Sequence, residues 1–279
     1  MLTPLLLAAA LALTPAQAPA SPATPAAPVA AGALVLTNVR TTFGELGGPR
    51  PLTPLLPGDV MFLGFDIEGI TTDAEGRVQY AMFMELLDSA GVSKYKTDPA
   101  NKNDFVPLGG NKIPGRAYTT VGLDQTPGIY VLKVTVTDLA NKATKTVEQK
   151  FAVAAKDFGI VAVYTSVDER GQIPMPTTGM VGQPLFIQLG IVGFGRGADK
   201  KPNVEVEMVP LDEKGNPTIA KASLLPIQGG VDEKDAGVTI RYLLPLTRAG
   251  KFTIRLKATD KVTNKTHTFT LPVTALANN

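Results

Sequence analysis

One pattern occurs twice in this sequence, at residues 128–144 (GIYVLKVTVTDLANKAT) and at residues 250–266 (GKFTIRLKATDKVTNKT). In each copy, apolar and polar residues alternate along a run that stops at a Thr-Asp pair, and a second run begins after a polar turn. Such alternation is typical of a strand with one buried face, and two such runs around a turn predict a hairpin. Because a hairpin needs further strands to bury its apolar face, the repeat predicts two β-sandwiches.

A constant spacing relates the two copies well beyond the hairpin. Matching residues lie 124 positions apart along most of the copy and 122 positions apart at the hairpin. The pairs are Leu34/Phe158, Gly58/Gly182, Gly69/Gly193, Tyr80/Val204, Met84/Met208, Asp88/Asp212 and Gly91/Gly215 at the first spacing, and Gly128/Gly250 and Asp138/Asp260 at the second. A register that is kept across strands and turns and changes only within a loop indicates the duplication of one domain.

The pattern of each copy predicts about seven strands. The expected strands are residues 34–39, 60–67, 78–87, 117–123 and the hairpin to 153 in the first copy, and 158–164, 185–192, 204–211, 238–246 and the hairpin to 273 in the second. One further strand in each copy has no clear bounds, and no segment has a helical period with end signals. The predicted fold class is therefore all-β, with two tandem antiparallel β-sandwich domains at residues 33–155 and 156–279. A linker of four residues, 154–157, predicts that the domains sit end to end.

The N-terminal segment predicts export. The apolar run at residues 5–13 is too short to span a bilayer, and Ala16-Gln17-Ala18 supplies the small residues that a signal peptidase requires. We therefore expect a signal peptide at residues 1–18, with an uncleaved apolar tail as the alternative. Residues 19–32 are rich in Pro and Ala and predict a semi-rigid spacer. The expected location is the periplasm, the cell surface or the medium, with no membrane span after cleavage.

Composition excludes several classes of function. The chain has no Cys, no Trp and one His, which removes disulfides, thiolate nucleophiles and most acid–base or metal chemistry near neutral pH. The net charge of +2 is too small to predict a nucleic-acid partner. We expect no enzymatic activity, no cofactor and no bound metal.

The start of each hairpin allows a comparison with known families. The segments PGIYVLKV and AGKFTIRL resemble the F strand of immunoglobulin-like and fibronectin-type-III-like sandwiches, as found in tandem modules of secreted bacterial proteins. The resemblance implies the fold and a tendency toward adhesion or scaffolding, without an activity. It also implies that Tyr130 is a corner tyrosine and that Leu132 takes the place of a core cysteine. Phe252 and Ile254 hold these places in the second copy, and Phe252 lacks the hydroxyl group.

The outward residues of the hairpin differ between the copies and give the first candidate surface. In the second copy they are Lys251, Thr253, Arg255 and Lys257, opposite Glu205 and Glu207, as in a solvated sheet with cross-strand ion pairs. In the first copy they are Ile129, Val131 and Lys133, beside Ala81 and Phe83. A contiguous exposed apolar surface is typical of an interface, whereas single exposed apolar residues are common on any protein. Ala81, Phe83, Ile129 and Val131 are therefore candidate residues for binding another protein.

Basic residues on two loops of the second copy form another candidate surface. They are Arg196, Lys200, Lys201, Lys261 and Lys265. In a sandwich of this kind the two loops lie at the same end, where a basic patch suits an acidic polysaccharide. A competing and favoured hypothesis is that this end docks against acidic loops of the first copy, which carry Asp88, Asp98, Asp104 and Asp124.

Four further patterns are interpreted as structural. They are the glycine-rich loop at residues 193–201, His267, the loop residues Asp98, Asn101, Asn103 and Asp104, and the pair Asp66 and Glu68. The glycine loop leads toward a strand rather than the helix that a phosphate site requires. His267 is expected at the edge of the core. Calcium binding by the polar loop is the alternative to a solvated loop, because no EF-hand spacing is present.

Together these observations predict an exported, non-catalytic binding or scaffold protein, a monomer that acts through protein–protein contacts. The partner is an unidentified protein or a cell-surface polymer. The alternative function is binding of acidic polysaccharide by the basic loops of the second copy.

Overall fold

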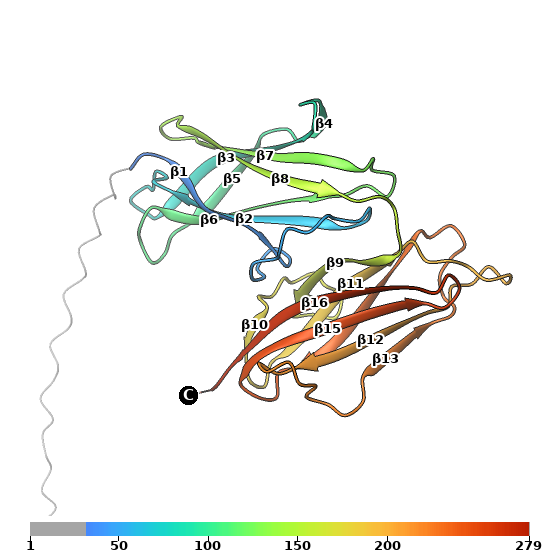
Figure 1. Cartoon of the computed structure of the whole chain (residues 1–279). Helices are drawn as coiled ribbons and strands as arrows, with labels where there is room; N and C mark the ends of the chain where they lie inside the picture. The colour runs from blue at the N-terminus through green and yellow to red at the C-terminus, as the bar shows by residue number, and fades with distance from the viewer. Residues whose placement is uncertain (1–31, 279) are drawn as a thin grey trace, which may run out of the picture.

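The computed structural model describes residues 32–278, so the predicted signal peptide and almost all of the predicted spacer lie outside the described residues. The described part contains sixteen strands and no helix, and it therefore offers no helix able to cross a membrane. The strands form four sheets in two sandwiches (Figure 1). The predicted all-β fold of two antiparallel sandwiches is confirmed.

The first sandwich packs a three-stranded sheet on a five-stranded sheet. The smaller sheet has the order β1-β2-β6, with β1 at Val35–Thr42, β2 at Val60–Glu68 and β6 at Lys112–Thr120. The larger sheet holds β4 (Ser93–Lys96) and β5 (Ala100–Phe105), which both pair with β3 (Arg77–Asp88), followed by β7 (Gly128–Asp138) and β8 (Thr144–Val153). Inward residues of the two sheets, such as Leu63 and Leu132, are almost fully buried and form one core.

The second sandwich repeats this arrangement. Its smaller sheet has the order β14-β11-β9, with β9 at Gly159–Ser166, β11 at Pro184–Val192 and β14 at Gly237–Pro245. Its larger sheet has the order β10-β16-β15-β12-β13, with bounds Thr178–Met180, Lys265–Leu276, Gly250–Asp260, Val204–Leu211 and Ser223–Ile227. The short strand β10 is parallel to β16, and the other pairs are antiparallel. The strands that the sequence pattern did not define are β4 and β5 in the first copy and β13 in the second. They pair with the outer edges of β3 and β12.

One strand differs clearly from its prediction. Residues 117–123 were expected, but β6 begins at Lys112 because Ile113, Gly115 and Ala117 form its buried face. A Cβ built on Gly115 lies 2.2 Å from the ring of Phe65, so the ring occupies the space that a side chain would need. The sequence Pro114-Gly115 is typical of a turn, whereas here the glycine allows the close approach of an aromatic core residue.

The two Thr-Asp pairs have a common structural role. Asp138 and Asp260 are fully buried at the ends of β7 and β15. The Asp138 carboxylate accepts a hydrogen bond from the Thr71 amide at 2.8 Å, and the Asp260 carboxylate accepts one from the Gly195 amide at 2.7 Å. Thr71 and Gly195 are 124 residues apart and belong to equivalent loops. Each aspartate therefore connects its hairpin to the loop that follows β2 in the first sandwich or β11 in the second.

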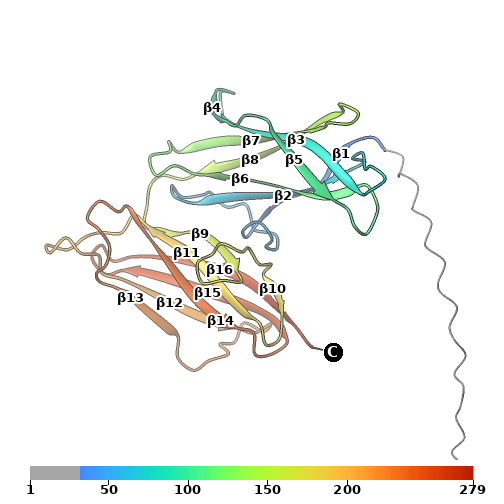
Figure 2. The same ribbon diagram turned by 180° about the vertical axis from the view of Figure 1, so that it is seen from behind.

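The sandwiches lie side by side rather than end to end (Figures 1 and 2). The segment between β1 and β2 leaves the first sandwich and packs against β9 and β16 of the second. Phe43 of this segment is 2% exposed and belongs to the core of the second sandwich, where its ring meets that of Phe269 edge-on at 6.0 Å between centroids. The short linker alone had predicted end-to-end domains, and this prediction is wrong because the segment provides a second contact, through Phe43.

Candidate functional site

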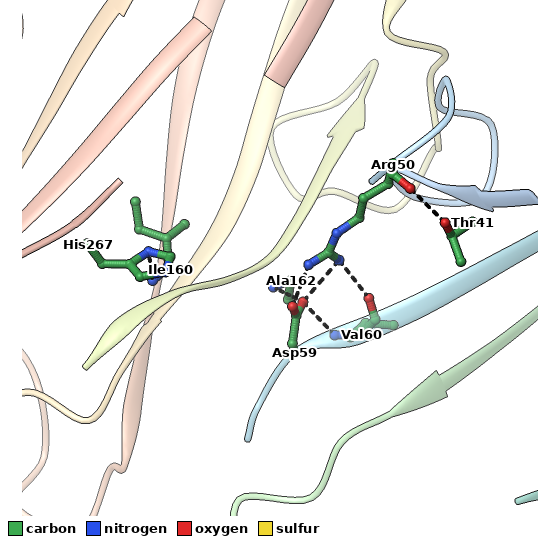
Figure 3. Close-up of polar contacts among 7 residues, drawn as sticks. All are labelled: Thr41, Arg50, Asp59, Val60, Ile160, Ala162 and His267. Atoms are coloured by element: carbon green, nitrogen blue, oxygen red, sulfur yellow. Dashed lines mark hydrogen bonds and ion pairs between the residues drawn. The ribbon is translucent and has the colours of Figure 1, made fainter. Parts of the chain in front are cut away.

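A buried ion pair stands at the contact between the sandwiches (Figure 3). The Asp59 carboxylate lies 2.5 Å from the Arg50 guanidinium, and both side chains are less than a tenth exposed. The same carboxylate accepts hydrogen bonds from the amides of Val60 and Ala162, each at 2.8 Å. Because Ala162 belongs to β9, one carboxylate joins two elements of the first sandwich to the second.

The backbone at Ala162 has an unusual conformation that directs its amide toward Asp59. Its φ is +50°, in the left-handed region that costs a residue with a Cβ about 1–2 kcal/mol. The register of β9 against β11 shifts at this point, which is a β-bulge, and the bulge turns the Ala162 amide toward Asp59. Asn38, 124 residues earlier, has the same φ of +50° at the bulge of β1. The duplicated bulge thus serves as a docking point in the second copy.

His267 lies close to the same contact. Its Nδ1 accepts a hydrogen bond from the Ile160 amide at 3.2 Å, so Nδ1 carries no proton. Burial lowers the pKa of the imidazole, against the opposing attraction of Asp59 and Asp157. Gly159 separates this ring from Leu56 of the first sandwich, and a Cβ there would come within 2.3 Å of the Leu56 side chain. His267 therefore has a structural role where the sandwiches meet.

The candidate binding residues of the first copy share the outer face of β3 and β7. Leu87 is directly opposite Val131, and Ile129 follows Val131 along the same face. Ile129 is 38% exposed, whereas Ala81, Phe83 and Val131 are half-buried. The ammonium group of Lys96 lies 5.5 Å from the centre of the Phe83 ring. The face therefore has two apolar parts, Ala81 with Phe83 and Leu87 with Val131 and Ile129, and the opposed residues Glu85 and Lys133 lie between them. We call Ala81, Phe83, Leu87, Ile129 and Val131 the outer strip.

The equivalent face of the second copy is charged. Glu205 and Glu207 replace Ala81 and Phe83, and Lys251 replaces Ile129. Glu207 lies 4.0 Å from Arg255, and Glu205 lies 2.8 Å from Lys261. Both glutamates of this face thus pair with cations of their own sandwich, in line with a solvated sheet.

The basic residues of the second copy are largely paired with nearby groups. Their ion pairs are Lys200 with Glu233 at 3.1 Å, Lys261 with Glu205 at 2.8 Å and Lys265 with Asp157 at 2.6 Å. The Arg196 guanidinium donates to the main-chain carbonyls of Asp232 and Asp235. Of these five side chains, only that of Lys201 has no hydrogen-bond or ion-pair partner among the described residues. None of the five pairs with an acidic residue of the first sandwich within residues 32–278, so the expected docking of these five against the acidic loops is wrong. Asp124 pairs instead with Lys156, beside the linker, at 3.7 Å.

The other polar patterns are held by local structure. Asn101, Asn103 and Asp104 belong to the extended strand β5, whose successive side chains point to opposite faces and cannot surround one cation. Asp104 accepts a hydrogen bond from the Tyr80 hydroxyl at 2.9 Å. Residues 32–278 contain no cluster of three or more acidic or histidine side chains suited to a metal.

Asp66 and Glu68 share one cation. Lys112 lies 2.8 Å from Asp66 and 3.0 Å from Glu68, and its hydrogen bonds hold the pKa of both carboxyl groups below their usual range. Two ionised carboxylates on an open sheet give no general acid, which needs a raised pKa. This pair is therefore a cross-strand contact between β2 and β6.

The sequence alone did not predict the residues at the contact between the sandwiches. Arg50 lies between prolines and Asp59 follows a glycine, so both read as turn residues. The one available signal is Phe43, a large apolar residue within a segment rich in glycine and proline. By contrast, the hydrogen bond that the family resemblance implies for Tyr130 is present, because its hydroxyl donates to the Thr126 carbonyl at 2.8 Å.

No protein-family model and no curated protein matches this chain. Among solved structures, the chain is similar to a transglutaminase from red sea bream, with 9% sequence identity and a TM-score of 0.27. The similarity covers 88% of this chain and 31% of the transglutaminase, so the chain spans about a third of the length of that protein. At this TM-score the likeness carries no argument about function.

Proposed function

We propose that this chain is an exported binding or scaffold protein without catalytic activity, built from two immunoglobulin-like domains, and that it holds another protein on the outer strip. The observation that carries the proposal is the difference between the duplicated faces. Positions that hold Glu205, Glu207 and Lys251 in the second copy hold Ala81, Phe83 and Ile129 in the first. The two faces occupy equivalent positions of the repeat, and solvation alone does not require the apolar residues of the first copy.

The geometry of the outer strip suits a protein partner. Leu87, Val131 and Ile129 form a contiguous apolar end, and Phe83 adds an aromatic anchor under Lys96. Aromatic residues in such surroundings dominate binding energy at many interfaces. Lys133, which is 3.5 Å from Glu148 and opposite Glu85, lies between the two apolar parts and offers polar groups beside both.

The test is retention of partners from the exported fraction of the source cells. Phe83→Glu places a charge at the centre of the strip and should remove a bound protein that the unchanged chain retains. Glu207→Gln, at the equivalent position of the second copy, is the matched control and should retain it. Circular dichroism confirms that both variants fold. If Phe83→Glu retains every partner of the unchanged chain, the outer strip is not the binding surface.

The alternative, binding of acidic polysaccharide, rests on the basic residues of the second copy. Three of these already have carboxylate partners, which a polysaccharide would need to displace. We therefore place this function second. Salt-dependent retention on an acidic polysaccharide column, lost in a double variant with Lys200→Glu and Lys201→Glu, would favour it over the protein-binding proposal.

A further inference from the structure

A pocket opens between the two sheets at one end of the second sandwich. Its volume is about 410 Å³, within the range of ~300–1,000 Å³ for small-molecule sites. Its walls are mainly apolar and include Pro210, Ile219, Leu246, Phe252, Ile254 and Val273. Ile254 and Val273 are almost fully buried and form the closed inner end of the pocket.

At the same corner of the first sandwich, the space between the sheets is closed, and the nearby pocket of about 610 Å³ lies outside the sheets, beside Asp88, Lys94 and Thr126. The remaining space beside Leu86, Val121, Tyr130 and Phe151 is too small for a water molecule. The rings of Tyr130 and Phe151 stack with centroids 6.0 Å apart. The Tyr130 hydroxyl is anchored on the Thr126 carbonyl, which fixes the ring in the corner. The duplicated fold can therefore fill this corner completely.

Substitutions between the copies explain why the second corner is open. Leu86 pairs with Leu132 in β3 and β7, and Pro210 pairs with Ile254 in β12 and β15, so Pro210 takes the place of Leu86. At the hairpin spacing of 122, Val273 takes the place of Phe151. Both changes remove side-chain volume from the same corner. Apolar atoms that line such a space lack packing partners on one side, and the apolar part of a ligand could supply them.

Arg248 gives the pocket its chemical character. It lines the pocket at the position that Thr126 holds in the first copy. Its side chain is exposed, and its guanidinium carbon lies 5.3 Å from the centre of the Phe252 ring. Within residues 32–278, no carboxylate lies within ion-pair distance of Arg248. A guanidinium group offers paired N–H donors whose geometry matches a carboxylate.

We propose that this pocket binds a small carboxylic acid with an apolar body, such as a medium-chain aliphatic acid. The apolar body lies against Phe252 and Ile254, and the carboxylate pairs with Arg248. This site is separate from the outer strip and does not depend on the proposed protein-binding function. A ligand site here would give the two copies different roles, because the second copy has Pro210 and Val273 where the first has the larger Leu86 and Phe151.

Calorimetric titration of the whole chain with octanoate, and with 1-octanol as a neutral analogue, tests the proposal. We expect saturable binding of octanoate at one site. Arg248→Gln should weaken octanoate binding by about threefold or more and leave 1-octanol binding unchanged. Lys251→Gln, which removes a nearby exposed cation outside the pocket, is the matched control and should leave both unchanged.

Val273→Phe fills the corner with the residue that the first copy has and should abolish binding of both compounds. Circular dichroism and urea unfolding establish whether that variant folds, and Arg248→Gln decides the question if it does not. The proposal is overturned by absence of saturable octanoate binding, by equal effects of Arg248→Gln and Lys251→Gln, or by full binding in a folded Val273→Phe variant.

Discussion

The imidazole of His267 shows how one residue couples the contact between the sandwiches to pH. Its Nδ1 accepts a hydrogen bond from Ile160 on β9, two residues before the Ala162 amide that Asp59 binds. Protonation would place a second hydrogen against the Ile160 amide and end this bond. Asp59 and Asp157 are the acidic groups that face the ring, and Lys265 pairs with Asp157 at 2.6 Å.

Stability should therefore fall as the pH falls through the titration of His267. Burial lowers the pKa of the folded imidazole below its ordinary value of 6.5. Between these two pKa values the unfolded chain binds more protons than the folded chain, so the free energy of unfolding decreases as pH decreases, by at most about 1.4 kcal/mol per pH unit for one proton.

The measurement is urea unfolding from about pH 7.5 to about pH 5.5, a range that lies above most carboxyl titrations. The slope should be clear in the unchanged chain and reduced in His267→Gln, whose amide oxygen can accept from Ile160 without titrating. Identical slopes in the two proteins would show that His267 does not carry the pH dependence.

The segment between β1 and β2 is the element that joins the sandwiches. It contributes Phe43 to the second core and Arg50 to the ion pair, and it leads into Asp59. Asp59→Ala should destabilise the chain by about 3–5 kcal/mol, because it leaves the buried guanidinium without a partner. The Ala162 amide also loses its acceptor. Asp124→Asn is the control, since the Asp124 side chain is 97% exposed and its ion pair with Lys156 is 3.7 Å long.

Urea unfolding and solution scattering together check this prediction. The expected result for Asp59→Ala is a lower midpoint and an increased radius of gyration, with both values unchanged for Asp124→Asn. An Asp59→Ala variant with the midpoint and the radius of the unchanged chain would mean that the ion pair does not hold the sandwiches together.

Most strands could be predicted from the sequence, whereas this connecting element could not. Strand β15 alternates because one of its faces is buried and the other carries charged residues, and β7 keeps the same inward pattern although its outer face begins with Ile129 and Val131. Strand β6 was placed too late because Gly115 is buried without an apolar side chain. Arg50 and Asp59 are polar loop residues whose burial depends on a surface far away in the sequence, and no local pattern carries that information.

At the scale of the whole molecule, the duplication explains what the sequence could predict about function. Equivalent positions show where the copies differ, and this comparison predicts Phe83 and Ile129 as candidate binding residues from the sequence alone. The same comparison could not find the pocket at Phe252, because an open corner depends on the combined volume of Pro210 and Val273 rather than on any one residue. The side-by-side arrangement could not be predicted either, because the linker length indicated end-to-end domains and no local sequence pattern shows that Phe43 contacts the second core.

Site-specific photocrosslinking tests the central claim, that the duplicated faces have different roles. A photoreactive phenylalanine analogue is placed at position 83 in one protein and at position 207, its equivalent in the second copy, in another. After exposure to the exported fraction, position 83 should form a discrete adduct with one partner protein, and position 207 should form none. Adducts of the same size and yield from both positions, or from neither, would contradict the assignment of protein binding to the outer strip.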